Sequence, residues 1–288
     1  MNSLLDRTTA LFDRLHRVWE RDGIRRAVAV GLVLIFLVAL IAIELNRRGL
    51  LPQALGFERP INHYMAINLA FTLVLILEVI SLIFTLHCSV SRALGKQFEI
   101  LALIFLRSSF KELTVLPEPI TIAGHLDVLW RIGADGIGAV AVFGLLGLYS
   151  AALRQKDEAL RSGPSLDLFV AAKKAVALLL LMVFFGMGLY NGWLLATGGR
   201  GFEFFQHFYT VLIFTDILLV LVSHYFLPEF RAVFRNSGYA LCTLLIRLAV
   251  TAPPFYNVLI GVSSAALAVI LTFIYNKFYM SETKEGDL

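Results

Sequence analysis

The strongest constraint on the fold of this chain is a series of apolar segments, most of them long enough to cross a lipid bilayer as a helix. The hydrocarbon core of a bilayer is about 30 Å thick, and about 20 helical residues span it. Lipid offers the backbone no hydrogen-bond partner, so an apolar segment of this length must satisfy its own backbone as a helix. Apolar runs occupy residues 27–45, 66–86, 94–113, 128–153, 170–195, 208–227, 239–250 and 255–278. The sequence therefore predicts an all-α, polytopic transmembrane bundle of about eight helices that contact lipid.

Composition excludes a soluble domain and gives no sign of catalysis. Hydrophobic residues make up 58% of the chain and charged residues only 16%, whereas soluble domains carry about 25% charged residues. The two cysteines, Cys88 and Cys242, indicate neither a disulfide framework nor a cysteine-rich metal site. No HExxH, Walker A or nucleophile-elbow motif is present, and no basic stretch resembles a nucleic-acid-binding motif. We therefore expect a non-enzymatic protein without a cofactor or a metal, and without nucleic acid as a partner.

The distribution of basic residues predicts the orientation of the helices. With eight spans and residues 1–26 in the cytoplasm, seventeen Lys and Arg residues fall on the inner side and six on the outer side. The six outer residues are Arg47, Arg48, Arg59, Lys111, Arg131 and Arg200. Basic residues concentrate on the cytoplasmic side of membrane proteins. Omitting the run that contains Arg107 or the run that contains Arg247 would spoil this asymmetry, so we expect both runs to cross and both termini to be cytoplasmic.

Residues 1–23 are predicted to form an amphipathic helix at the membrane interface. The segments LLDR, LFDR and VWER recur at intervals of seven residues, so leucine and aromatic side chains share one helical face. That face includes Leu11, Phe12, Leu15 and Trp19. It could lie at the bilayer interface, bind another membrane-protein subunit, or cap the bundle; the sequence alone leaves these alternatives open.

The two halves of the chain follow a similar plan. Glu78 precedes Arg92-Ala93-Leu94 and a run with Arg107, while Asp216 precedes Arg231-Ala232-Val233 and a run with Arg247. This pattern predicts two parallel four-helix repeats, related by an axis along the membrane normal. The expected segments are the interfacial helix 1–23, repeat 1 at 24–156, a cytoplasmic linker at 157–166, repeat 2 at 167–280 and a polar tail at 281–288.

The second half resembles the phosphate-starvation-inducible E (PsiE) family of four-span bacterial membrane proteins. The similar stretches are FTDILLVLVSHYF at 214–226, LLIRLAV at 244–250 and NVLIGVSSAALAVILTFIYNKF at 257–278. In the first half, Glu44 before Asn46 resembles the acid that closes the family's first helix. The resemblance implies a four-helix unit, here in tandem, in the bacterial inner membrane. It also implies an accessory, structural or stress-related role, because the family brings no established chemistry.

Five charged residues within the apolar runs are the main candidates for a functional site: Glu78, Arg107, Asp135, Asp216 and Arg247. A charge facing lipid costs several kcal/mol, so these side chains should face inward and pair. We expect Glu78 to meet Arg107 and Asp216 to meet Arg247. Such pairs could fix the helix register or contact another subunit of a larger complex. Alternatively, they could form a conduit for protons or ions.

Two further features suggest sites. His87 and His224 occupy similar positions in the two halves and could serve as axial ligands of a haem in an electron carrier. Histidines at the membrane interface are more often satisfied by water or lipid headgroups, so we expect no haem.

The fourth run contains small residues at the spacing that lets helices approach closely. Gly133, Ala134 and Gly138 carry this pattern. The run is therefore predicted to lie in a helix interface, either within the chain or between subunits.

Overall fold

The chain forms a bundle of long helices. The computed structural model describes residues 2–50, 62–86, 89–116, 124–154, 164–199, 201–226 and 230–279, and in these ranges it contains α-helices, one short 3₁₀ turn and no strand. The helices are α1 (Asn2–Trp19), α2 (Asp22–Arg47), α3 (Tyr64–Thr85), α4 (Val90–Glu112), α5 (Leu126–Arg154), α6 (Pro164–Ala196), α7 (Phe204–Phe226), α8 (Phe230–Thr251) and α9 (Tyr256–Tyr279), with η2 (Leu113–Val115) after α4. The all-α prediction is confirmed, and each apolar run coincides with one helix from α2 to α9. Most of the expected linker and the whole tail at 281–288 lie outside the described residues.

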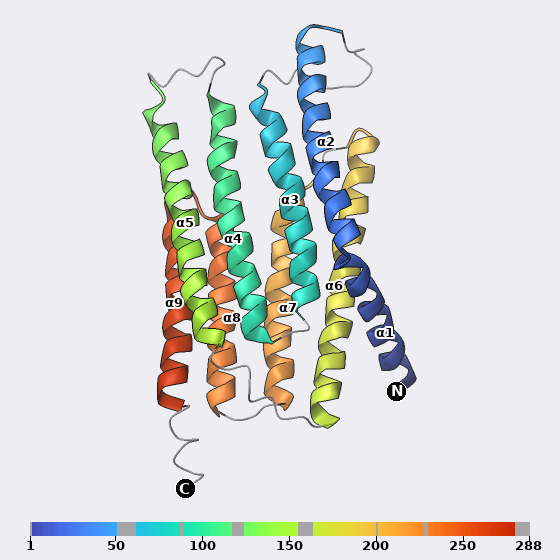
Figure 1. Cartoon of the computed structure of the whole chain (residues 1–288), viewed down its shortest axis with the longest axis vertical. Coiled ribbons are helices and arrows are strands. Elements are labelled where there is room, and N and C mark those ends of the chain that lie inside the picture. Colours follow the sequence, from blue (N-terminus) through green and yellow to red (C-terminus); the bar gives the residue numbers. More distant parts are fainter. Residues whose placement is uncertain are drawn as a thin grey trace.

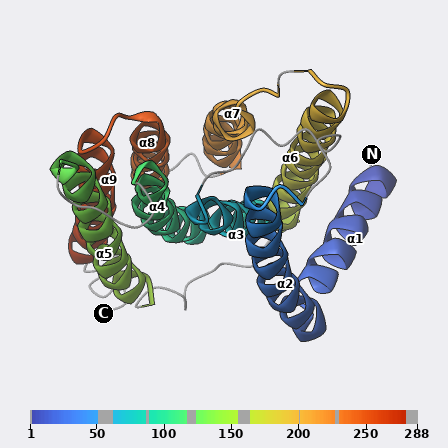
Figure 2. The same cartoon turned by 90° about the horizontal axis from the view of Figure 1, so that it is seen from above.

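The helices α2 to α9 stand in two rows (Figures 1 and 2). One row contains α2, α3, α4 and α5, and the other contains α6, α7, α8 and α9 in the same order. Across the rows α4 packs on α8, α5 on α9 and α3 on α6. The predicted twofold axis between the repeats would place α2 opposite α9 across the two rows. Figure 2 shows α2 and α9 at opposite ends of the rows, with α5 beside α9. Helices at equivalent positions in the two halves thus lie next to each other at one end of the rows.

Hydropathy separates the helices into two classes. Six of the described helices are long and apolar enough to cross a membrane: α2, α3, α5, α6, α7 and α9. The remaining long helices, α4 and α8, contain the arginines Arg107 and Arg247, and both stand between other helices of their row (Figure 2). A helix with neighbours on several sides can present polar side chains to protein rather than to lipid. In α8, Arg247 is only 2% exposed, while Leu244 and Leu248 point outward.

Large apolar side chains cover the outside of the bundle. Val33, Leu34 and Val38 of α2, and Met182 and Leu189 of α6, are more than half exposed. A soluble protein rarely exposes contiguous apolar surface of this extent. The chain is therefore a membrane protein whose apolar helices contact lipid.

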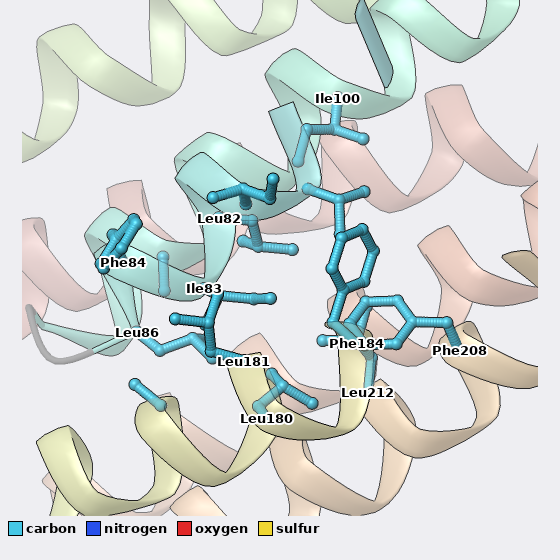
Figure 3. Packing of buried hydrophobic residues seen from close by; sticks show 14 of the residues in the cluster. Leu82, Ile83, Phe84, Leu86, Ile100, Leu180, Leu181, Phe184, Phe208 and Leu212 are labelled. Atoms are coloured by element: carbon cyan, nitrogen blue, oxygen red, sulfur yellow. The ribbon is translucent and has the colours of Figure 1, made fainter. Parts of the chain in front are cut away.

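An apolar core joins α3, α6 and α7 (Figure 3). Ile83 of α3 and Phe208 of α7 are fully buried, and Leu180 of α6 is 2% exposed. The ring of Phe184 lies edge-to-face on that of Phe208, with their centroids 4.8 Å apart. Aromatic pairs in this geometry contribute about 0.5–1.5 kcal/mol beyond the area they bury. This core fixes α6 and α7 against the first half of the chain.

The amphipathic helix α1 packs on the bundle itself. Phe12 is 1% exposed and lies edge-to-face on Phe84 of α3, with ring centroids 5.7 Å apart. Lys174 of α6 forms an ion pair of 2.7 Å with Asp13. The apolar face expected to bind the membrane interface or another subunit is therefore used at Phe12 within the chain. A position at the membrane interface and contact with another subunit stay predictions, since Leu11 and Val18 of α1 remain 51% and 43% exposed.

Close packing of α5 on α9 depends on one glycine of the small-residue pattern. A Cβ atom on Gly138 would lie 2.7 Å from Cγ1 of Val258, closer than real Cβ atoms approach. Gly133 has no such neighbour within 4 Å. The interface predicted for this run is therefore internal at Gly138.

We expect Gly138→Leu to lower the melting temperature of the detergent-solubilised protein, because the added side chain would force α5 away from Val258. Overpacking of this kind costs about 1–3 kcal/mol. Gly144→Leu on the same helix is the matched control, since Gly144 has nothing within 4 Å. Equal melting temperatures for the two variants would contradict the close α5–α9 contact.

Candidate functional site

Asp216 of α7 and Arg247 of α8 form the buried ion pair of the described residues. Their side chains are 10% and 2% exposed, and Nη2 of Arg247 lies 3.8 Å from Oδ2 of Asp216. This distance is that of an ion pair without a hydrogen bond, because charge-assisted bonds between nitrogen and oxygen are about 2.7–2.9 Å long. Accordingly Nε and Nη2 of Arg247 and Oδ2 of Asp216 have no hydrogen-bond partner among the described residues.

On one side of this pair, toward the chain termini, lies a small cavity. Asp216 lines it together with Gln97 of α4, Lys173 of α6 and Thr243 of α8. Its volume of ≈ 20 Å³ suits one water molecule, which needs about 10–15 Å³ of such space and two or more polar neighbours. Gln97 and Lys173 are themselves 1% and 5% exposed. The cavity is thus small and mostly apolar, with the carboxylate of Asp216 and three other polar side chains in its wall.

On the other side of the pair, two residues continue the polar line. The guanidinium of Arg247 lies 5.5 Å from the ring centroid of Tyr209. The phenol oxygen of Tyr209 has no hydrogen-bond partner among the described residues, although the side chain is 4% exposed. Beyond it, the guanidinium of Arg107 on α4 lies 5.8 Å from the ring centroid of Phe205 on α7.

Tyr209 and Arg107 form the inner wall of a larger pocket, which we call the outer pocket. Its volume is ≈ 370 Å³, and it lies between α3, α4, α7 and α8. The exposed residues Lys111, Glu203 and Gln206 stand at its mouth. These residues belong to the last turn of α4 and the start of α7, so the outer pocket opens at the end of the bundle away from the chain termini (Figure 1).

Unsatisfied polar atoms concentrate along this line. Among the described residues eleven buried side-chain nitrogen or oxygen atoms have no hydrogen-bond partner, and six of them lie here. They are Oε1 of Gln97, Nε of Arg107, the phenol oxygen of Tyr209, Oδ2 of Asp216, and Nε and Nη2 of Arg247. A buried polar atom without a partner costs about 1–3 kcal/mol. Buried polar atoms of native proteins are nearly all partnered, and water or a bound ion is one common partner where the protein supplies none.

The expected partner of Glu78 was wrong. Glu78 lies 2.6 Å from Nζ of Lys96, which also contacts Glu99 at 2.7 Å. The reason is helical rise: α3 and α4 form an antiparallel hairpin, and Arg107 stands eleven residues beyond Lys96, about 16 Å farther along α4. α7 and α8 form the second antiparallel hairpin. A rise of about 1.5 Å per residue places Arg247 only about 10 Å farther from its turn than Asp216. A long arginine side chain can approach a carboxylate over that smaller offset.

Asp135 belongs to a separate contact. It is 5% exposed, and Nδ2 of Asn257 on α9 donates to its Oδ1 at 2.8 Å. This hydrogen bond satisfies the carboxylate between α5 and α9, away from the line through Asp216. Asn257 was not singled out as a partner from the sequence, although an amide in the first turn of an apolar helix could have indicated one.

The haem hypothesis concerns residues that the structure describes only in part. His87 lies outside the described residues, and the side chain of His224 is not among those described. Within the described ranges no group of three His, Cys, Asp or Glu side chains could hold a metal ion.

Comparison with family models, with curated proteins and with solved structures finds no match to this chain. The geometry of the polar line must therefore support any functional argument by itself.

We expect Arg247→Gln to destabilise the protein by about 3–5 kcal/mol, because it leaves the Asp216 carboxylate buried without its counter-charge. Arg131→Gln is the control: Arg131 also lies 3.8 Å from a carboxylate, that of Glu112, but its side chain is 41% exposed. An exposed pair contributes less than about 1 kcal/mol. Adding Asp216→Asn to Arg247→Gln should recover much of the loss in melting temperature. Equal losses for the two single variants would argue against a buried charge pair.

Proposed function

We propose that the chain is a non-enzymatic protein of the bacterial inner membrane in which all eight helices from α2 to α9 cross the bilayer. The excess of Lys and Arg on one side supports this topology, with both termini in the cytoplasm. The first residues of α1 and the last of α9 lie at the same end of the bundle (Figure 1). The resemblance to a tandem of PsiE-like four-helix units is part of this proposal.

The function that the geometry supports best is conduction of protons along the line between α4, α7 and α8. The observation that carries it is the set of six unsatisfied polar atoms between the outer pocket and the small cavity. Tyr209 and Thr243 contribute hydroxyl groups, and Asp216 contributes a carboxylate that can take up and release a proton. Water in the two cavities would link these groups.

A purely structural tether fits the same residues less well. A tether gains its stability from short hydrogen bonds that satisfy both partners, because desolvation of the two ions must be offset. Arg247 and Asp216 are 3.8 Å apart and leave three polar atoms without a partner. The contact between Asn257 and Asp135 at 2.8 Å shows what a satisfied buried contact looks like in this protein.

The charges along the line favour protons over metal cations. Arg107, Arg247 and Lys173 are positive, and Asp216 is the acid between them. In a medium of low dielectric constant this excess of positive charge repels a cation such as sodium or potassium. The same charges repel a proton, but a proton can bind covalently to the Asp216 carboxylate and neutralise it, which a metal cation cannot do.

The second candidate is an accessory subunit of a larger membrane complex. It is favoured by the exposure of α2, in which Ile43 is the only buried residue. The acids Glu78 and Glu99 also line a groove of ≈ 450 Å³ between α4 and α5. Purification in mild detergent distinguishes the two candidates, because a subunit brings its partner chains with it.

We expect purified protein in liposomes to dissipate an imposed pH gradient, with potassium and valinomycin clamping the membrane potential. Asp216→Asn should reduce the proton flux at least about tenfold, because an amide cannot exchange a proton at this point of the path. Asp135→Asn is the matched control, a buried acid away from the line, and should retain the flux. A wild-type protein without flux, or equal flux in the two variants, would contradict the proposed function.

Reporter fusions test whether α4 and α8 cross the membrane. We expect fusions after Arg161, after Pro228 and at Leu288 to report the cytoplasm, and fusions at Arg59 and Arg200 the opposite side. If only the six most apolar helices crossed, the fusions after Arg161 and Pro228 would report the outside. The fusion at Arg200 would then report the cytoplasm, and the fusions at Arg59 and Leu288 would not change. The three sites at Arg161, Arg200 and Pro228 are therefore decisive.

A further inference from the structure

We propose that the outer pocket binds a small organic carboxylate, held by Arg107 and Lys111 and with its apolar part against the phenylalanines of α7. The proposal builds on the proposed proton path by giving it a ligand at its outer entrance. Its test measures binding at equilibrium, so it can succeed or fail independently of proton flux.

The charge of the outer pocket suits a single negative charge. Arg107 and Lys111 line it together with one acid, Glu203. Neither cation forms an ion pair with any described residue, and Nε of Arg107 has no hydrogen-bond partner there. Glu203 stands at the mouth, whereas Arg107 is partly buried beside Tyr209. The deeper part of the outer pocket is therefore the more positive.

The free guanidinium edge of Arg107 favours a carboxylate. The guanidinium lies over the ring of Phe205, 5.8 Å from its centroid, which leaves its N–H groups to donate in the plane of the group. A planar carboxylate can accept two parallel hydrogen bonds from such an edge. The ammonium of Lys111, one helical turn farther along α4, adds a second positive charge on the same wall.

The remaining wall favours an organic body over an inorganic anion. Leu75, Ile104, Phe204 and Phe205 line the outer pocket beside the cations. A volume of ≈ 370 Å³ falls within the range of about 300–1,000 Å³ in which small-molecule sites bury their ligands. Burial of apolar ligand surface contributes about 25 cal/mol per Å², which an inorganic anion would not gain. The ligand class is thus a monocarboxylate with a compact apolar group.

The test uses benzoate and its uncharged counterpart benzamide with the full-length protein in lipid nanodiscs, followed by calorimetry. We expect benzoate to bind at least about tenfold more tightly than benzamide, and Arg107→Gln to weaken benzoate binding by about tenfold or more. Lys111→Gln, at an exposed position, should weaken it less. Arg131→Gln, which removes a cation of α5 outside the outer pocket, should leave it unchanged.

A second measurement separates a binding residue from a structural one. Arg107 is a partly buried charge without a counter-ion, so Arg107→Gln should raise the melting temperature of the ligand-free protein while it lowers benzoate affinity. A structural arginine would show the opposite change in melting temperature.

Three results would overturn the proposal. Equal affinities for benzoate and benzamide would remove the role of charge, and unchanged benzoate binding in Arg107→Gln would remove the role of that residue. Tighter binding of inorganic phosphate, or of vesicles of anionic phospholipid, than of benzoate would assign the outer pocket to an oxyanion or a lipid headgroup instead.

Discussion

In hydrocarbon, a polar group without a partner costs several kcal/mol, and this constraint organises the whole bundle. The apolar helices α2, α5 and α6 present their side chains to lipid, while α4 and α8 stand between neighbours and carry the buried arginines. Arg247 can be buried because Leu244 and Leu248 of α8 lie on the exposed side, while Asp216 and Tyr209 of α7 lie beside its guanidinium. The arrangement of helices into two rows is therefore also a separation of polar from apolar surface.

The sequence predicted the helices well, because their pattern depends on the bilayer and on local periodicity. Each apolar run became a helix, and Asp216 approaches Arg247 as the burial of charge required. The sequence failed where the answer depended on the axial level of residues on neighbouring helices. Glu78 and Arg107 looked equivalent to the second pair, but a hairpin with a short turn places Glu78 at the level of Lys96 instead. An offset of a few residues decided the partner.

Gln97 and Tyr209 show a second limit of the sequence. Each is one of several polar residues in its helix, and nothing in its neighbours along the chain distinguishes it from a residue at the interface. Their importance arises only because α4 and α7 bring them to the same interior as Asp216 and Arg247. The amphipathic pattern of residues 1–23 likewise predicted an apolar face but could not reveal that α3 and α6 cover it. Contacts between distant segments are the information that a single sequence lacks.

The packing of α1 on the bundle has a consequence for how the protein is made. Asp13 and Lys174 are 161 positions apart in the chain, so their contact cannot form until α6 has left the ribosome. Before that moment the apolar face around Phe12 lacks α6 and can only rest against α3 or the membrane surface. Because synthesis adds about 5–20 residues per second, this interval lasts on the order of ten seconds. α1 therefore reaches its final position only after a helix that is synthesised much later, and its contact with α6 joins distant parts of the chain.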